Sequence, residues 1–164
     1  MTGIIEQINV SPGGIPKRPI PEALLTREGI RSDAWAHPRI HGGRDKAVLL
    51  MCAEVIEELR QQGYPVYPGA LGENFTVRGI DHRQLRSGQR FRAGEAVIQL
   101  TTVREPCATL DVYSPSLKAA IYDPAVRAGD SSSPRWVRSG MYAFVVEPGI
   151  VRSKDIIALM DAAV

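Results

Sequence analysis

Cysteine is scarce in this sequence. Cys52 and Cys107 are the only two among 164 residues, which is too few for the four thiolates that an iron–sulfur cluster usually needs. The spacings CxxC and HExxH and the EF-hand pattern are also missing, so a metal site built from protein ligands alone is not expected. Any metal would have to arrive within a cofactor.

Long apolar runs and charge of one sign are lacking too. No stretch approaches the roughly 18 apolar residues that a membrane-spanning helix needs, and "MTGIIEQINV" does not resemble a secretory signal sequence. The net charge is only +2, and the arginines are scattered. We therefore expect a cytoplasmic protein with two free thiols that binds neither nucleic acid nor membrane. A local anion site remains open.

The length and the 44% share of hydrophobic residues fit a single domain that spans residues 1–164. The clearest helix is "CAEVIEELRQQG", in which Val55, Ile56 and Leu59 share one face. Short helices are predicted after Cys107, and residues 26–44 read as a long loop. Apolar stretches between glycine and proline turns predict strands at 3–11, 46–51, 75–80, 89–94, 95–105 and 141–149, and 154–164 predicts a last strand that runs into a helix.

Many short strands with long loops and few helices favour a closed or nearly closed β-barrel over a βαβ sheet. The expected fold class is therefore mainly β, a barrel with a few short helices.

Two glycine-containing loops are candidate binding sites. In "HPRIHGGR", Gly42 and Gly43 allow a tight turn that presents N–H groups, and Arg39, His41 and Arg44 add positive charge, which together suit a phosphate or another anion. Taken alone, a solvated turn explains this stretch better. The phosphate-binding patterns GxxxxGK[ST] and strand–GxGxxG–helix are absent.

The second loop, "PGALGENF", offers the carboxylate of Glu73 and the amide of Asn74 immediately before a strand. By itself this stretch favours a hairpin turn in which Asn74 bonds to its own backbone. A chemical role for the two side chains needs further support.

Cys107 has a chemical setting that Cys52 lacks. Pro106 fixes the approach of the chain, Arg104 is close, and a helix that begins at residue 108 would place the thiol at its positive end. These conditions favour a thiolate, which either ligates a soft metal or acts as a nucleophile. Cys52 lies at a strand-to-helix junction without a basic neighbour, where a small buried apolar residue is expected.

A fourth cluster is "SPRWVRSG". Arg135 and Arg138 flank Trp136, a combination that suits stacking on a flat ring or pairing with phosphate. A structural role on the rim of a barrel explains these residues equally well.

Taken in order, "HGGRDKAV", "PGALGENFTVRGI" and "LRSGQRFRAGEAVIQLTTVREPC" resemble the MOSC domain, named for the C-terminal domain of molybdenum cofactor sulfurases. The resemblance is strong from Gly29 to Cys107 and weaker through "SGMYAFVVEPGIVRSKD", which resembles the C-terminal strand pair of small stand-alone bacterial members. It implies a β-barrel that binds the molybdenum cofactor, a molybdopterin.

In this family the metal is held by the pterin dithiolene and by a cysteine, and the position of that cysteine corresponds to Cys107. The resemblance further implies that His41, Gly42, Gly43, Glu73 and Asn74 form pocket walls. We also assign Arg39, Arg44, Arg104, Arg135 and Arg138 to cofactor binding on their charge. Two positions depart from the family pattern, Ser32 in place of a glycine and Lys154-Asp155 in place of Gly-Asp.

The resemblance implies an oxidoreductase that reduces N-hydroxylated compounds, such as hydroxylaminopurine, with electrons from a separate protein. One alternative is a sulfur carrier in which Cys107 takes a persulfide. Another is a non-catalytic module that binds a small anion, a cofactor or a partner. A Cys107–His41 hydrolase is a weaker idea, because no third orienting residue can be named. Pyridoxal phosphate is not expected.

Overall fold

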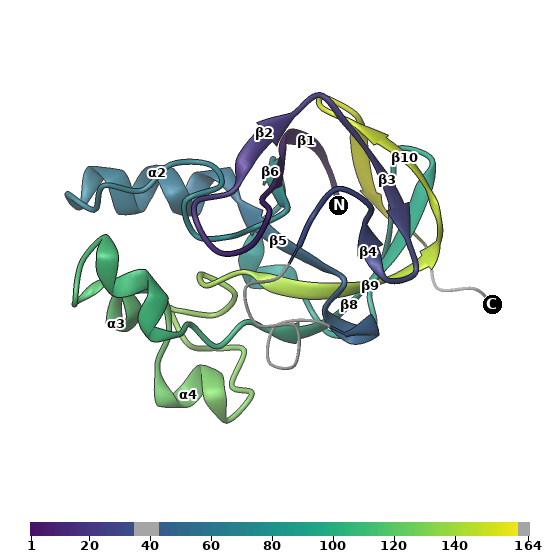
Figure 1. Cartoon of the computed structure of the whole chain (residues 1–164). Coiled ribbons are helices and arrows are strands. Elements are labelled where there is room, and N and C mark those ends of the chain that lie inside the picture. The colour runs from purple at the N-terminus through teal and green to yellow at the C-terminus, as the bar shows by residue number, and fades with distance from the viewer. Residues whose placement is uncertain (35–42, 161–164) are drawn as a thin grey trace.

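The computed structural model describes residues 1–34 and 43–160. Strands that form a barrel occupy one side of the molecule, and the helices project from the other side (Figure 1). The strands are β1 (Thr2–Val10), β2 (Arg18–Ile20), β3 (Glu22–Thr26), β4 (Gly29–Ile30), β5 (Val48–Cys52), β6 (Phe75–Arg78), β7 (Arg90–Ala93), β8 (Ala96–Val103), β9 (Met141–Glu147), β10 (Gly149–Arg152) and β11 (Ile156–Leu159). The α-helices are α2 (Ala53–Gln61), α3 (Leu117–Ile121) and α4 (Pro124–Arg127), and the 3-10 helices are η1 (Arg44–Lys46), η2 (His82–Gln84) and η3 (Ala108–Val112).

The main sheet closes on itself. Its strand order is β11-β7-β8-β9-β5-β6-β1-β2, and β1 also pairs with β11, with Thr2 opposite Ala158. The far end of β1 carries β2, with Ile8 opposite Ile20. Closure removes exposed sheet edges, and the predicted mainly β barrel is confirmed.

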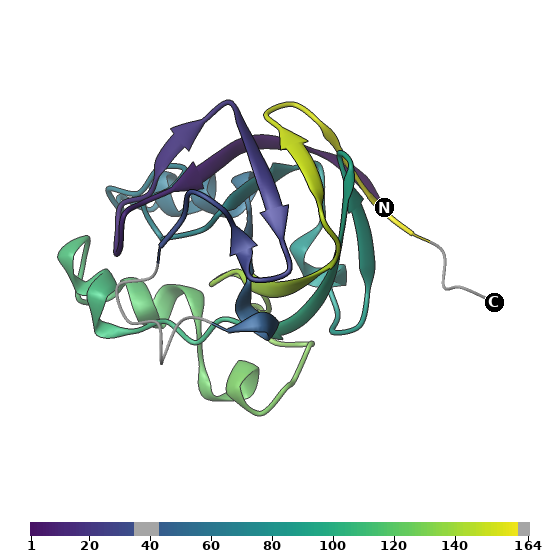
Figure 2. The same cartoon turned by 45° about the vertical axis from the view of Figure 1, so that its right-hand side comes forward.

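A smaller sheet of order β10-β3-β4 lies beside this barrel (Figure 2). Residues 26–44 were predicted to be a loop without regular structure, but Gly29 and Ile30 form β4 and pair with β3. Strands β2 and β3 were also missed by the sequence analysis. They are only three and five residues long, so a local pattern carries little signal for them.

The barrel contains one βαβ unit, which the sequence analysis did not predict. Strands β5 and β6 are parallel, with Leu50 opposite Phe75, and α2 is the crossover between them. Every other pairing in the described part of the chain is antiparallel. A parallel pair needs a long connection, and α2 provides it while burying Val55, Ile56 and Leu59.

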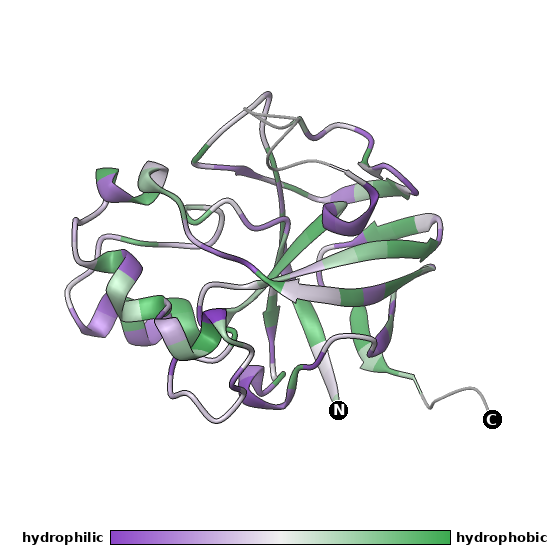
Figure 3. Ribbon diagram, turned by 90° about the horizontal axis from the view of Figure 1, so that it is seen from below, coloured by the Kyte–Doolittle hydropathy of each residue, from purple (hydrophilic) through white to green (hydrophobic). Residues whose placement is uncertain are grey.

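The core lies inside the barrel and beneath α2. All five residues of β5 are buried, because this strand is covered on both faces, whereas β7 alternates and buries only Phe91 and Ala93. The ribbon coloured by hydropathy shows apolar strands and more polar connections (Figure 3). The short helices predicted after Cys107 are present, and so is the last strand, β11. The helix predicted at the end falls largely on residues 161–164, which lie outside the described residues.

Candidate functional site

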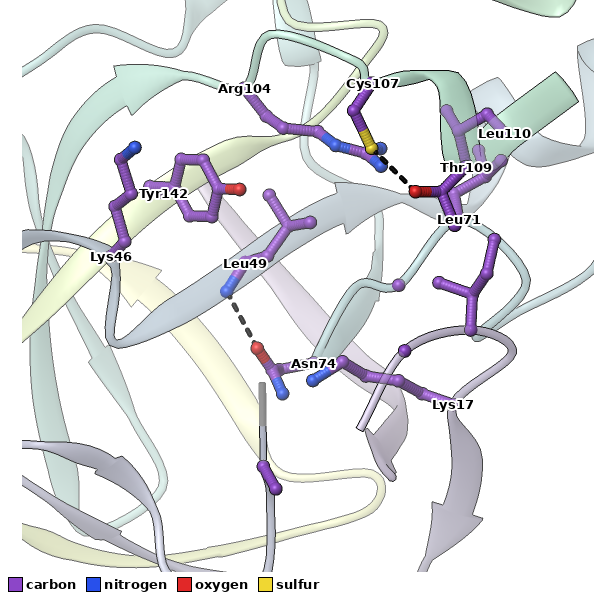
Figure 4. Close-up of a pocket in the computed structure, with 14 residues that line it drawn as sticks. Lys17, Lys46, Leu49, Leu71, Asn74, Arg104, Cys107, Thr109, Leu110 and Tyr142 are labelled. Carbon is purple, nitrogen blue, oxygen red and sulfur yellow. Dashed lines mark hydrogen bonds between the residues drawn. The ribbon is translucent and has the colours of Figure 1, made fainter. Parts of the chain in front are cut away.

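Cys107 opens onto a cavity of about 150 Å³ at one end of the barrel (Figure 4). The walls come from the segments that leave or enter strands β2, β4, β5, β6, β8 and β9. These segments are far apart in sequence, and the closed sheet brings them to one place. The lining residues are Gly14, Ile15, Lys17, Ala34, Lys46, Leu49, Leu71, Gly72, Asn74, Arg104, Cys107, Thr109, Leu110 and Tyr142.

Strand β8 and helix η3 position the cysteine. Beyond the end of β8, the Arg104 N–H still donates to the Gly140 carbonyl at 2.9 Å. The extended backbone at Cys107 then begins η3, and its carbonyl accepts from the Leu110 N–H at 3.2 Å. The expected strand–proline–cysteine–helix arrangement is therefore confirmed, with a 3-10 helix in place of an α-helix.

The surroundings of Cys107 favour its thiolate. Partial burial works against ionisation, but hydrogen bonds from the hydroxyl and the backbone N–H of Thr109, together with the charge of Arg104, outweigh it and lower the pKa of the thiol. The Thr109 hydroxyl oxygen lies 3.1 Å from Sγ. Cys107 is a free cysteine that is only partly buried, so the sulfur is both accessible and disposed to ionise.

Cys52 has the opposite environment. Only 3% of the residue is exposed, and burial, reinforced by Glu54 and Asp81, raises the pKa of its thiol. The expectation that Cys52 is a small buried core residue is confirmed.

Arg104 contributes a buried cation to the cavity. The residue is 7% exposed, and its Nη1 makes a long contact of 3.4 Å to the Ser139 carbonyl. The Ser139 hydroxyl donates to the Arg104 carbonyl at 2.6 Å, which fixes the backbone. Burial lowers the pKa of the guanidinium, while Tyr142, Cys107 and Glu73 oppose this shift. A guanidinium stays protonated in proteins, so the wall beside the thiol is positively charged.

Tyr142 and Lys46 line the cavity from the start of β9 and the end of η1. Tyr142 lies opposite Leu49 in the sheet, and the Lys46 ammonium lies 5.5 Å from the centre of its ring. Burial raises the pKa of Tyr142, Arg104 lowers it, and Cys107 raises it. The phenol is therefore protonated at neutral pH.

A buried polar network supports the opposite wall. Asp33 pairs with Lys17, and its two carboxylate oxygens also accept from the Ser11 N–H and the Asn74 amide, each at 2.8 Å. Asn74 continues the network to β5, because its Oδ1 accepts from the Leu49 N–H at 3.0 Å. Burial lowers the pKa of Lys17, against the effect of Asp33. Asn74 thus joins β4 to β5 as well as lining the cavity.

Glu73 lies behind the cavity wall and is fully buried. Its Oε1 accepts from the Gly69 N–H at 2.6 Å and the Thr76 hydroxyl at 2.9 Å, whereas Oε2 has no partner among residues 1–34 and 43–160. Burial raises the pKa of this carboxyl, against the hydrogen bonds and the charge of Arg104. Glu73 was assigned to a pocket wall, but it instead holds the turn at Gly69 that presents Leu71 and Gly72 to the cavity.

The residues assigned from sequence divide into separate places. Asn74, Arg104 and Cys107 meet at the cavity. Gly43 and Arg44 line a different surface groove, together with Arg27 and Glu28, so a role for them at the cavity remains a prediction. Arg39, His41 and Gly42 lie outside the described residues.

Arg135 and Arg138 are not among the described residues that line this cavity. Arg135 pairs with Asp123 at 3.3 Å. Arg138 pairs with Glu58 of α2 at 2.6 Å, and these two residues line a separate groove. Trp136 is buried and donates to the Leu85 carbonyl at 2.9 Å. The placement supports the structural interpretation of this cluster, and a role for Arg135 and Arg138 in cofactor binding remains a prediction.

Lys17, Lys46, Thr109 and Tyr142 line the cavity but were missed by sequence reasoning. Thr109 follows the cysteine by two residues, so the helix start contained a usable signal for it. Lys17, Lys46 and Tyr142 had none, because strand register alone brings them to Cys107.

No group of three or more His, Cys, Asp or Glu side chains within residues 1–34 and 43–160 is arranged to hold a metal ion. Among the helices that the structure describes, none has the length and apolar character to cross a membrane.

The structure thus describes a small β-barrel domain with a thiolate-favouring cysteine on the wall of a cavity at one end. The family model for the MOSC domain matches residues 37–158, most of the chain. The protein belongs to the MOSC domain family.

Two curated bacterial proteins are similar in sequence. YflK, an uncharacterized protein of Bacillus subtilis, is 41% identical over 101 residues, which make up 59% of this chain and 45% of YflK. Protein YiiM of Escherichia coli is 32% identical over 96 residues, 56% of this chain and 43% of YiiM. The matched regions therefore cover less than half of either relative.

Crystal structures with the same fold include YiiM from Geobacillus stearothermophilus, with a TM-score of 0.74 and 24% identity over 97% of this chain and 75% of that one. YuaD from Bacillus subtilis has a TM-score of 0.71 and 20% identity over 96% of this chain and 94% of that one. At these identities the likeness establishes the fold.

Proposed function

We propose that this protein binds the molybdenum cofactor at the Cys107 cavity and reduces N-hydroxylated compounds. The observation that carries the proposal is the placement of a free, partly exposed cysteine with a lowered thiol pKa on the wall of an end cavity in a MOSC barrel. Membership of the family supports an association with the molybdenum cofactor.

The chemistry of the cavity fits such a group. The Cys107 thiolate would supply a soft sulfur ligand to the metal. Arg104, Lys46 and Tyr142 offer hydrogen-bond donors to anionic or oxygen-bearing groups. The cavity volume of about 150 Å³ is below the roughly 300–1,000 Å³ of most small-molecule sites. The cavity alone is therefore smaller than a site for a whole cofactor, and Cys107 would hold the metal from its wall.

When bound, molybdenum supplies a centre that passes electrons to the substrate. The overall reaction converts R–NHOH, two electrons and two protons into R–NH₂ and water, with cleavage of the N–O bond. Electrons would come from a separate electron-transfer protein. The residues of this chain have narrower tasks: Cys107 ligates through its thiolate, Thr109 keeps that sulfur ionised, and Arg104 places positive charge beside it.

Metal and pterin analysis of protein from a molybdopterin-competent host tests the proposal. We expect near-stoichiometric molybdenum and pterin in the wild type and in Cys52→Ser, and loss of both in Cys107→Ser with unchanged circular dichroism. The wild type should reduce a hydroxylaminopurine when a chemical reductant replaces the partner, and Cys107→Ser should not. Folded wild-type protein without molybdenum or pterin would refute the proposal.

The same thiolate also suits a sulfur carrier. If the protein has this second function, the same preparations should lack the cofactor, and the mass of Cys107 should be higher by one sulfur atom.

A further inference from the structure

The Tyr142 hydroxyl faces the cavity. Its ring is fixed by pairing of β9 with β5 and by the Lys46 ammonium 5.5 Å from the ring centre. No hydrogen bond of the hydroxyl to another residue occurs within residues 1–34 and 43–160. The close-up shows the oxygen on the side of the ring that faces Leu49, Arg104 and Cys107 (Figure 4).

The Tyr142 side chain is partly buried, and a tyrosine hydroxyl in such a position usually has a hydrogen-bond partner, either in the protein or in water. The walls of the cavity offer it none among the described residues, so the hydroxyl is available to donate to a group that enters the cavity. Leu49, Leu71 and Leu110 make the rest of the lining near it apolar, which strengthens a hydrogen bond formed there.

Arg104 also has N–H donors without a close acceptor among the described residues. A guanidinium has five N–H donors, and within the described part of the chain the side chain of Arg104 makes one hydrogen bond, the 3.4 Å contact to the Ser139 carbonyl. The residue is 7% exposed and lines the cavity. Tyr142 and Arg104 thus both present donors to the cavity next to Cys107 that have no close acceptor among the described residues.

We propose that the Tyr142 hydroxyl, assisted by the Arg104 guanidinium, donates a hydrogen bond to the oxygen of the substrate's N–O group and holds that oxygen beside Cys107. The inference rests on the proposed function, since it assigns a residue to the same site. As the N–O bond breaks, negative charge collects on this oxygen, and donors fixed in advance stabilise charge that develops there. Tyr142 would then determine specificity for N–O compounds and would be a catalytic residue.

The alternative is that Tyr142 only packs against Lys46 and Leu49. Tyr142→Phe separates the two, because it keeps the ring and the contact with Lys46 and removes only the hydroxyl. Tyr64→Phe is a matched control, since the Tyr64 hydroxyl bonds to Ser116 at 3.2 Å, at an exposed position away from the cavity lining.

The first measurement uses holoprotein from a molybdopterin-competent host. Molybdenum content should be equal in the wild type, Tyr142→Phe and Tyr64→Phe. For reduction of a hydroxylaminopurine, kcat should fall on the order of 10²–10³-fold in Tyr142→Phe alone, with KM changed less than kcat. Equal metal content with an unchanged kcat in Tyr142→Phe would overturn the inference and leave the proposed function standing.

The second measurement needs no cofactor. In apoprotein from a molybdopterin-deficient host, benzohydroxamate supplies an N–O oxygen and should slow alkylation of Cys107 by iodoacetamide. The half-protecting concentration should rise at least about tenfold, equivalent to about 1.4 kcal/mol, in Tyr142→Phe but not in Tyr64→Phe. If the wild type carries no molybdenum, the proposed function fails, and this assay alone tests the role of Tyr142. That role is overturned if benzohydroxamate protects Cys107 equally in Tyr142→Phe, or if it does not protect Cys107 in the wild type.

Discussion

The Sγ atom of Cys107 lies 3.1 Å from Oγ1 of Thr109, the second residue of the helix that the cysteine begins. This contact ties the chemical state of the sulfur to a local hydrogen bond rather than to a distant charge alone. Hydrogen bonds from Thr109 are the largest influences that lower the pKa of Cys107, and they oppose the effect of burial.

Thr109→Val should raise the pKa of the Cys107 thiol, because valine keeps the shape of the side chain but cannot donate to the thiolate. The pH dependence of iodoacetamide alkylation measures this change, and the midpoint should move to higher pH. Thr101→Val is the control, since the Thr101 hydroxyl donates to the Asp45 carbonyl. An unchanged midpoint would assign the shift to Arg104 and the backbone.

The two thiols should differ in reactivity. Cys107 is partly exposed with a lowered thiol pKa, whereas Cys52 is buried with a raised one. One thiol per chain should therefore react rapidly with a disulfide reagent near neutral pH, and two should react in denaturant. Cys107→Ser should abolish the rapid phase, and two equal rapid phases in native protein would contradict the environment described for Cys52.

Asp33→Asn should destabilise the fold by about 3–5 kcal/mol, because it leaves the Lys17 ammonium buried without its counterion. The side chains are only 6% and 8% exposed. Urea unfolding measures the loss, and Glu105→Gln, which breaks the exposed pair with Arg127, should cost no more than about 1 kcal/mol. Adding Lys17→Met should recover part of the loss. A cost for Asp33→Asn no greater than for Glu105→Gln would mean that the network is not buried in solution.

Glu73→Gln should alter the pH dependence of stability. Burial raises the carboxyl pKa in the folded state, so between the ordinary carboxyl pKa and the raised one the unfolded chain loses a proton that the folded chain keeps. The contribution of Glu73 to the stability of the wild type is therefore fully present at low pH, and it falls as the pH rises from the ordinary carboxyl pKa to the raised one. Glutamine keeps an acceptor for Gly69 and Thr76 and has no such proton.

Urea unfolding at pH 5 and pH 8 checks this expectation, and Glu73→Gln should gain stability relative to the wild type at the higher pH. Glu73→Ala, which leaves the Gly69 and Thr76 donors unpaired, should lose about 1–3 kcal/mol per donor. If the difference in stability between the wild type and Glu73→Gln is the same at both pH values, Glu73 is not protonated in the folded state.

Lys46→Met should weaken retention of the cofactor more than Arg44→Met. Lys46 lines the Cys107 cavity, whereas Arg44 lines a different groove. Loss of one charge-assisted contact is worth about 1.5–3 kcal/mol, or on the order of a tenfold to hundredfold change in affinity. Molybdenum retained through dialysis measures it, and greater loss from Arg44→Met would return the anion site to the loop where the sequence analysis placed it.

Local sequence determined the backbone arrangement at Cys107, which lies between a strand and a helix. An apolar run predicts the strand that became β8, Pro106 ends it, and the residues that follow form η3. The same kind of pattern predicted α2 from Val55, Ile56 and Leu59 and the burial of Cys52 at its start. These features depend on neighbours within a few residues, so the sequence carries them directly.

Only the tertiary structure decided what surrounds the sulfur. The parallel pairing of β5 with β6, the contact of Asn74 with Asp33 across 41 residues, and the convergence of Lys46 and Tyr142 on Arg104 all follow from strand register and barrel closure. Arg138 resembles a ligand-binding residue in sequence, yet register and the position of α2 pair it with Glu58. A local pattern specifies which residues form a strand, but the partner of that strand depends on burial gained by the whole chain.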